Sequence, residues 1–167
     1  MPRRPLLVVP ALVLLLVLGV RTRGAEHRET AAPLGDARQP LPLPPAMAEH
    51  QKRSMREHLA AVQAIVAALG RDDLPTVAAA AGRLGFSEAT GRMCEHMGAA
   101  APGFTAMALD FHHTADGIGE AARRGDRTGV LAALDRTLQA CVRCHAAYRQ
   151  DVVDDATWKR LAGGGAR

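Results

Sequence analysis

Apolar side chains recur at helical spacing along most of the chain after residue 45. The clearest case is residues 46–69, where successive apolar positions are separated by alternating intervals of four and three. Gly70 follows as a natural stop. The pattern predicts a first helix from Ala46 to Leu69. Its predicted core-facing stripe is Met55, Leu59, Val62, Val66 and Leu69.

A capping residue marks the start of the next helix. Asp73 is suited to cap a helix that continues to about Leu84, with Pro75 in its first turn. Residues 87–101 give a weaker pattern. Ser87 is a candidate cap there, but two glycines lower the helical propensity of this segment.

Two long helices follow in the second half of the chain. The first is expected from Phe104 to Arg124, and Asp126 is suited to cap the next. In this last helix the apolar positions again alternate by three and four as far as Val152. The predicted core-facing stripe is Leu131, Leu134, Leu138, Cys141, His145, Tyr148 and Val152.

Long helices joined by short loops predict an all-α fold. Over residues 46–153 we expect an antiparallel, up-down-up-down four-helix bundle. Composition agrees, since the chain has three Phe, one Tyr and one Trp, whereas a sheet would favour aromatic and β-branched residues. Residues 154–167 are expected to fray after a last short turn.

The N-terminal segment has the pattern of a secretory signal. Arg3 and Arg4 precede an apolar run from residue 6 to residue 20, which spans about 22 Å as a helix and falls short of a membrane core of roughly 30 Å. Residues 1–24 are therefore predicted to be a signal peptide. The cleavage site is flanked by arginines, so an uncleaved N-terminal anchor is the alternative. Residues 25–45 are proline-rich and predict a flexible linker.

Net charge does not point to nucleic acid. The chain has 21 Lys and Arg against 17 Asp and Glu, but four of the arginines belong to residues 1–24. Without that segment both totals are 17, so the sequence pI of about 9.5 comes largely from the signal. We therefore expect no nucleic-acid partner.

The main chemical motif is Cys141-Val142-Arg143-Cys144-His145. Two cysteines three apart lie on one face of a helix, so both thiols can reach the two vinyl groups of one porphyrin. The histidine directly after the second cysteine is then placed as proximal iron ligand. The motif predicts one covalent haem c, with Cys141 and Cys144 as thioethers and His145 on the iron.

Three alternatives compete with haem attachment at this motif. A thioredoxin-like Cys-x-x-Cys expects a βαβ context, which the pattern does not indicate. A zinc site needs four ligands, and only Cys94 with His96 is available as a second half. A haem-free helical module, with Cys141 and Cys144 in a disulfide or on a metal, is the structural alternative.

A candidate for the opposite side of the iron comes from the expected topology. The first and last helices of such a bundle are antiparallel neighbours, and Met55 then lies at a height similar to that of His145. Its thioether is the candidate distal ligand, although methionine also fills gaps against a porphyrin. His58 is the candidate for a bis-histidine site. Met47 is a less suitable methionine ligand than Met55, because it lies about 80° off the stripe.

The run Cys141 to His145 followed by Ala146-Ala147-Tyr148-Arg149 resembles the class II cytochrome c family, which includes cytochrome c′. The resemblance covers roughly residues 46–153 and is most specific in this run, close to the C-terminus. It implies a four-helix bundle with haem on the last helix. It also implies that Tyr148 and Arg149 lie beside the haem, and that Met55 matches the methionine ligand of the low-spin branch.

The resulting functional prediction is a periplasmic monohaem cytochrome that transfers single electrons and is not an enzyme. Its partners would be redox proteins of the periplasm or inner membrane, and the resemblance also allows a homodimer. The alternative is a five-coordinate, cytochrome c′-like protein that binds small gases such as NO or CO at an open iron position.

Overall fold

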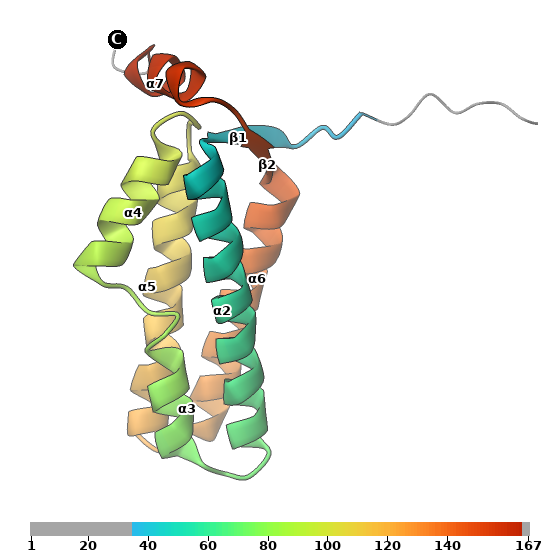
Figure 1. Cartoon of the computed structure of the whole chain (residues 1–167). Helices are drawn as coiled ribbons and strands as arrows, with labels where there is room; N and C mark the ends of the chain where they lie inside the picture. Colours follow the sequence, from blue (N-terminus) through green and yellow to red (C-terminus); the bar gives the residue numbers. More distant parts are fainter. Residues whose placement is uncertain (1–34, 165–167) are drawn as a thin grey trace, which may run out of the picture. The chain divides into compact units, whose positions relative to one another are not determined.

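Six helices and two short strands follow one another along the described residues, 35–164, in the computed structural model (Figure 1). Residues from Ala37 onward form one compact unit. The unit is mostly helical, as the sequence predicted. The elements are β1 (Gln39–Leu43), α2 (Pro45–Leu69), α3 (Leu74–Ala81), α4 (Glu88–Gly98), α5 (Phe104–Arg123), α6 (Arg127–Ala147), β2 (Tyr148–Val152) and α7 (Asp155–Gly164).

Four helices, α2, α3, α5 and α6, contribute to one hydrophobic cluster, which we call the helical core. Many of its members are alanines, and small side chains let the helices approach closely. The larger fully buried side chains include Ile65, Val77, Ile118 and Val130. The cluster consists of Ala61, Ile65, Ala68, Leu69, Val77, Ala80, Ala81, Leu84, Phe111, Ala115, Ile118, Ala121, Ala122, Val130, Ala133, Leu134 and Ala140.

The capping residues identified in the sequence begin the helices as expected. Asp73 accepts a hydrogen bond from the Thr76 amide at 3.1 Å, and Asp126 accepts one from Gly129 at 2.8 Å. Ser87 caps α4 in the same way, so the weakly patterned segment is a helix. Gly98 is required at the end of α4, because a Cβ there would meet the Thr105 side chain.

The two strands are a departure from the all-α prediction. β1 and β2 form a parallel pair in which Gln39 is opposite Tyr148 and Leu43 is opposite Val152. Residues 39–43 lie in the predicted flexible linker, and that prediction is wrong for them, since Leu41 and Leu43 are fully buried. Proline is compatible with the strand because both strands of a two-stranded sheet are edges.

The strand pair helps to build a second hydrophobic cluster, the strand-end core. It joins β1 and Tyr148 to the first turn of α2, the end of α4 and the start of α5. Several sulfur-containing side chains pack around it. The buried members are Leu41, Leu43, Ala48, Met97, Ala101, Phe104 and Tyr148, and Met47, Met93, Met107, Ala108, Cys144 and Ala147 pack against them.

The core-facing stripe predicted for α2 is wrong in part. Leu69 is buried and Val62 packs against the helical core, but Leu59 is 71% exposed and Val66 is also exposed. The helix instead buries Ala61, Ile65 and Ala68, about a third of a turn away. Alanine carries little apolar signal of its own, so the larger side chains on the adjacent face dominated the pattern.

Two further predictions concern the ends of the chain. The last predicted helix stops at Ala147 instead of Val152, and the tail expected to fray contains α7. Residues 1–24, the predicted signal peptide, lie outside the described residues. Within 35–164, no helix has the length and apolar character needed to cross a membrane.

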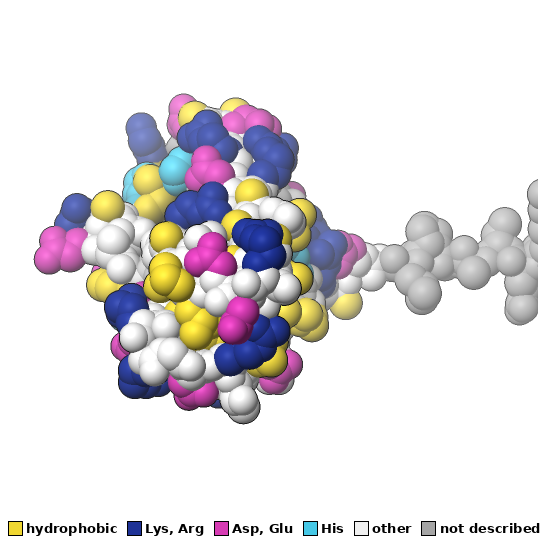
Figure 2. Space-filling view, turned by 90° about the horizontal axis from the view of Figure 1, so that it is seen from below, with side chains coloured by type: hydrophobic (Ala, Val, Ile, Leu, Met, Phe, Trp, Pro, Cys, Tyr) yellow, Lys and Arg dark blue, Asp and Glu magenta, His cyan; other side chains and the backbone are white. Residues whose placement is uncertain are grey.

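The charged surface is mixed on the face that Figure 2 shows. Lys and Arg side chains alternate there with Asp and Glu, and apolar side chains lie between them (Figure 2). This face therefore carries no extended basic patch of the kind that binds a phosphate backbone.

Candidate functional site

The Cys-x-x-Cys-His segment occupies the last two turns of α6, directly before β2. At Tyr148 the backbone becomes extended, with φ −123° and ψ 146°. The helix ends here because the next residues pair with β1. The Cys-x-x-Cys-His segment is therefore held between a long packed helix and a strand anchored to a distant part of the chain.

Its two cysteines contact different hydrophobic clusters. Cys141 packs against the helical core, and Cys144 packs against the strand-end core. Both are half-buried and neither forms a disulfide. Burial raises the pKa of both thiols, and for Cys144 the nearby Cys141 raises it further. At neutral pH the two sulfurs are therefore protonated thiols.

His145 lies on the solvent side of α6, whereas the sequence placed it on the core-facing stripe together with Cys141. The buried side of the helix is set by Ala133, Thr137 and Ala140. The backbone carbonyl of His145 accepts a hydrogen bond from Arg38 Nη1 at 3.2 Å. The imidazole is thus accessible to a ligand, and the residue's backbone is tied to the segment before β1.

The exposed side of α6 is apolar next to His145. Leu131, Leu138 and Val142 all share this side, with Leu138 41% and Val142 69% exposed. They precede His145 by fourteen, seven and three residues, which aligns them along one helix face. We call these three side chains the uncovered α6 stripe.

A similar uncovered stripe runs along α2. It consists of Met55, Leu59 and Val66, with Met55 39% exposed. The prediction that Met55 faces the interior is therefore wrong. Met55 belongs to neither hydrophobic cluster, because α2 turns its alanine-rich side towards α3. Buried residues of α2 and α6 belong to the same helical core.

His58, the second candidate for the iron, is half-buried and has aromatic neighbours on α5. Its ring centroid lies 5.0 Å from that of Phe111 and 5.5 Å from that of His112. His112 is buried, and its Nδ1 donates to the Leu84 carbonyl at 2.7 Å. Burial lowers the pKa of His58 to about 4, with a smaller contribution from His112. Burial also lowers the pKa of His112, so both rings are neutral at pH 7.

Only a faint indication of this histidine pair is present in the sequence. Each histidine stands at the edge of an apolar stripe, and such a position does not identify the residue opposite it on another helix. The two histidines meet because α2 is turned about its own axis relative to the predicted orientation. The same difference exposes Leu59.

Tyr148 and Arg149, which the resemblance placed beside a haem, both have protein partners. The Tyr148 hydroxyl donates to the Pro102 carbonyl at 2.7 Å, and its ring meets Phe104 edge-on at 5.4 Å. Arg149 Nη1 lies 3.3 Å from Asp151 Oδ1. Tyr148 thus joins β2 to the start of α5, and Arg149 is already paired with a carboxylate.

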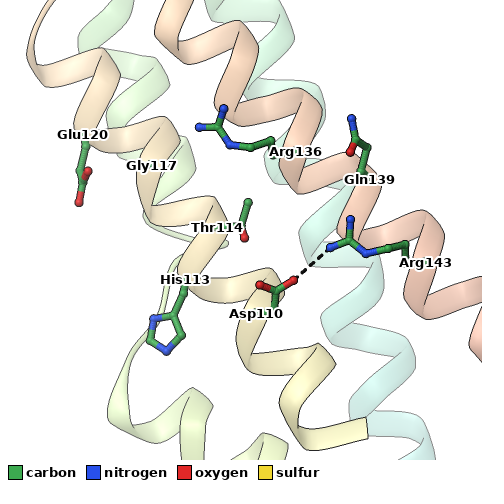
Figure 3. Close-up of a pocket in the computed structure, with 8 residues that line it drawn as sticks. All are labelled: Asp110, His113, Thr114, Gly117, Glu120, Arg136, Gln139 and Arg143. Carbon is green, nitrogen blue, oxygen red and sulfur yellow. Dashed lines mark hydrogen bonds and ion pairs between the residues drawn. The ribbon is translucent and has the colours of Figure 1, made fainter. Parts of the chain in front are cut away.

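A polar groove of about 460 Å³ lies on another side of α6, between this helix and α5 (Figure 3). Arg143, the middle of the motif, reaches across to Asp110 of α5, with Nη2 and Oδ2 3.1 Å apart. His113, Glu120 and Arg136 also line the groove. Its charged lining is poorly suited to a porphyrin face, which needs apolar contacts.

The described residues do not bring together the ligands of a conventional zinc site. Within 35–164, no three His, Cys, Asp or Glu side chains are grouped so that they could hold a metal ion. Cys94, the suggested second half of a zinc site, is buried on α4 and burial raises its pKa.

No family model, curated protein or solved structure matches this chain.

Proposed function

We propose that the protein is a c-type cytochrome that carries one haem on Cys141 and Cys144 and transfers single electrons. The observation that carries this proposal is an accessible His145 beside two half-buried thiols, at the end of an apolar helix face that the protein leaves uncovered. A large flat apolar group attached at this point would cover that face.

The residues of this chain fit such a group. Each thiol adds across one vinyl group, so that an S–C bond forms and the thiol proton passes to the other vinyl carbon. Cys141 and Cys144, three residues apart on α6, have the spacing for two such bonds. His145 supplies an imidazole to the iron, and the bound haem would supply reversible one-electron chemistry.

The two uncovered stripes support a position for the porphyrin at the outer seam of α2 and α6. Within the described residues, six large apolar side chains on these two helices are left exposed by the protein's own packing. Removing them from water would contribute about 25 cal/mol for each Å² of apolar area covered. The proposed fold is an antiparallel four-helix bundle. Its first arm is α2, its second arm is α3 followed by α4, its third is α5 and its fourth is α6.

The distal side of the iron has two candidate arrangements. Met55 is part of the α2 stripe, so its exposed thioether is a candidate ligand on a porphyrin that covers this stripe. His58 is a poorer candidate, because its ring already contacts Phe111 and His112. If Met55 only contacts the porphyrin, the iron is five-coordinate and binds small gases such as NO or CO.

We propose a periplasmic location and redox partners of the periplasm or inner membrane, which follow from the predicted signal and the proposed haem. A homodimer that covers the α2 stripe would account for its exposure in another way. Sedimentation of the mature protein distinguishes coverage by a porphyrin from coverage by a second subunit. If the haem protein is a monomer, only the porphyrin is left to cover the α2 stripe.

Expression with the cytochrome c maturation machinery tests the attachment. The mature chain should gain the mass of one haem that survives denaturation. Replacing Cys141 and Cys144 together by Ala should abolish the adduct. The matched control is Cys94→Ala, which should retain it because Cys94 is buried on another helix. An unmodified wild-type chain under these conditions would refute the proposal.

The electronic spectrum tests the distal ligand. Low-spin ferric iron with a weak sulfur-to-iron band in the red supports Met55, and Met55→Ala should then convert the protein to a high-spin form. A wild-type protein that is already high-spin and binds CO when reduced would favour gas binding instead. Low-spin iron that is unchanged in Met55→Ala would redirect the assignment to His58.

A further inference from the structure

A second site lies at the end of the molecule where α2 begins (Figure 1). A pocket of about 540 Å³ opens there between the first turns of α2, helix α4 and helix α7. Met47, His50, Met93, His96 and Trp158 are among the residues that line it. This set is rich in sulfur and imidazole donors, although the walls also include charged side chains from α7.

The donors come as two equivalent pairs. Met47 and His50 stand three residues apart on α2, and Met93 and His96 stand three apart on α4. Residues at this spacing share one helix face, with Cβ atoms about 5–6 Å apart. Each helix therefore directs one thioether and one imidazole to the same pocket.

We propose that these two Met-x-x-His pairs bind one Cu(I) ion. Thioether sulfur is a soft ligand that selects Cu(I), and imidazole also suits copper. Two thioethers and two imidazoles bring no negative charge as ligands, and the wall residues Asp155 and Lys159 carry opposite charges, which favours a monovalent ion over Zn²⁺ or Ca²⁺. The site is independent of the proposed haem, because none of its four ligands belongs to the attachment motif or the uncovered stripes.

The surroundings support the two methionines. Met47 and Met93 are half-buried and pack against the strand-end core, so their stems are held while their ends reach the pocket. Methionine has three rotatable bonds and adapts to a ligand with little backbone movement. This adaptability matters because the pocket is larger than a bare ion.

The two histidines differ in their neighbours. The His96 ring is exposed and lies against Trp158, with centroids 4.9 Å apart and an angle of 66°. His50 is half-buried, and its Nδ1 accepts a hydrogen bond from Arg53 Nη2 at 3.1 Å. The Trp158 Nε1 atom is buried without a hydrogen-bond partner among residues 35–164, which marks the pocket wall as incomplete.

Competition with a chromophoric Cu(I) chelator under anaerobic conditions tests the site. The full mature chain is used with Cys94→Ala as common background, and Cys141 and Cys144 are alkylated if they carry no haem. We expect one Cu(I) per chain. Replacing Met47 and Met93 together by Leu, which nearly conserves volume, should weaken binding by more than about tenfold. Met107→Leu is the matched control, since Met107 also contacts the strand-end core but does not line the pocket.

A second measurement separates ligation from a change in fold. X-ray absorption at the copper edge should show sulfur and nitrogen neighbours, and replacing His50 and His96 together by Gln should remove the nitrogen contribution. Failure of the chain to compete for Cu(I) would overturn the proposal. Unchanged affinity in the folded Met47 and Met93 double variant would do the same, whatever the outcome for haem.

Discussion

The helical core and the strand-end core are built in opposite ways. The helical core consists of alanines and aliphatic side chains that repeat at helical spacing within each of its helices. The strand-end core joins segments about a hundred residues apart, contains the rings of Phe104 and Tyr148, and is surrounded largely by methionine side chains. Cys141 contacts the first and Cys144 the second, so the Cys-x-x-Cys-His segment spans the boundary between them. The position of the motif is thus fixed by both kinds of packing.

Leu43→Ala should give the largest change, because Leu43 is fully buried in the strand-end core. We expect a loss of about 2–5 kcal/mol in the free energy of unfolding, measured by urea denaturation. The control is Val152→Ala, whose exposed side chain is in the paired strand and should change stability by less than about 0.5 kcal/mol. Equal small effects would mean that residues 39–43 are a loose linker after all.

Lowering the pH should reduce the free energy of unfolding through protonation of His58. Its pKa in the folded protein is about 4, below the ordinary value of 6.5, so the unfolded chain binds a proton first as pH falls. The contribution of the neutral ring is intact above pH 6.5 and is lost between pH 6.5 and 4. With partial screening by solvent, the loss is about 2 kcal/mol.

Urea unfolding at several pH values measures this dependence in the haem-free chain. His58→Phe should flatten the curve between pH 6.5 and 4. The matched control is His113→Gln on the exposed side of α5, which should leave the slope as it is. A slope that His58→Phe does not alter would contradict the assignment.

Tyr148→Phe tests the joint between β2 and α5 and should have a moderate effect. It removes the hydroxyl that donates to the Pro102 carbonyl at 2.7 Å but keeps the ring against Phe104. The expected loss is about 1 kcal/mol in the free energy of unfolding, since water can reach the exposed Pro102. A loss above roughly 3 kcal/mol would assign Tyr148 a larger role in the strand-end core.

The smallest expected effect is that of Leu138→Ala in the haem-free chain, because this side chain belongs to neither core. Stability should change by less than about 0.5 kcal/mol. In the haem-loaded protein the same substitution should cost more, since the porphyrin is proposed to cover it. Urea unfolding of both forms makes the comparison, and identical small effects would place the porphyrin elsewhere.

The sequence predicted one of these cores much better than the other. Helical periodicity and the caps Asp73, Ser87 and Asp126 located the helices, because these signals are local. The rotation of α2 was missed, since alanine packs well but barely contributes to an apolar pattern. The strand pair was also missed, because Leu41 and Leu43 alternate with prolines and their partner strand is distant in the chain.

The candidate sites follow the same division. The spacing of Cys141, Cys144 and His145 is evident in the sequence, whereas the partial burial of the two cysteines depends on both cores. The pocket with Met47 and Met93 carried no sequence signal, because its pairs lie on different helices and only the fold brings them together.

The parallel pairing of β1 with β2 has a consequence for the order of folding. Parallel strands need a crossover, and here that crossover is the whole helical part of the chain between Leu43 and Tyr148. Closing so long a loop carries an entropy cost that local helix contacts avoid. The strand pair should therefore form late in folding and separate early in unfolding. During folding, the end of α6 that bears Cys144 and His145 would then stay loose until the chain's two distant segments meet.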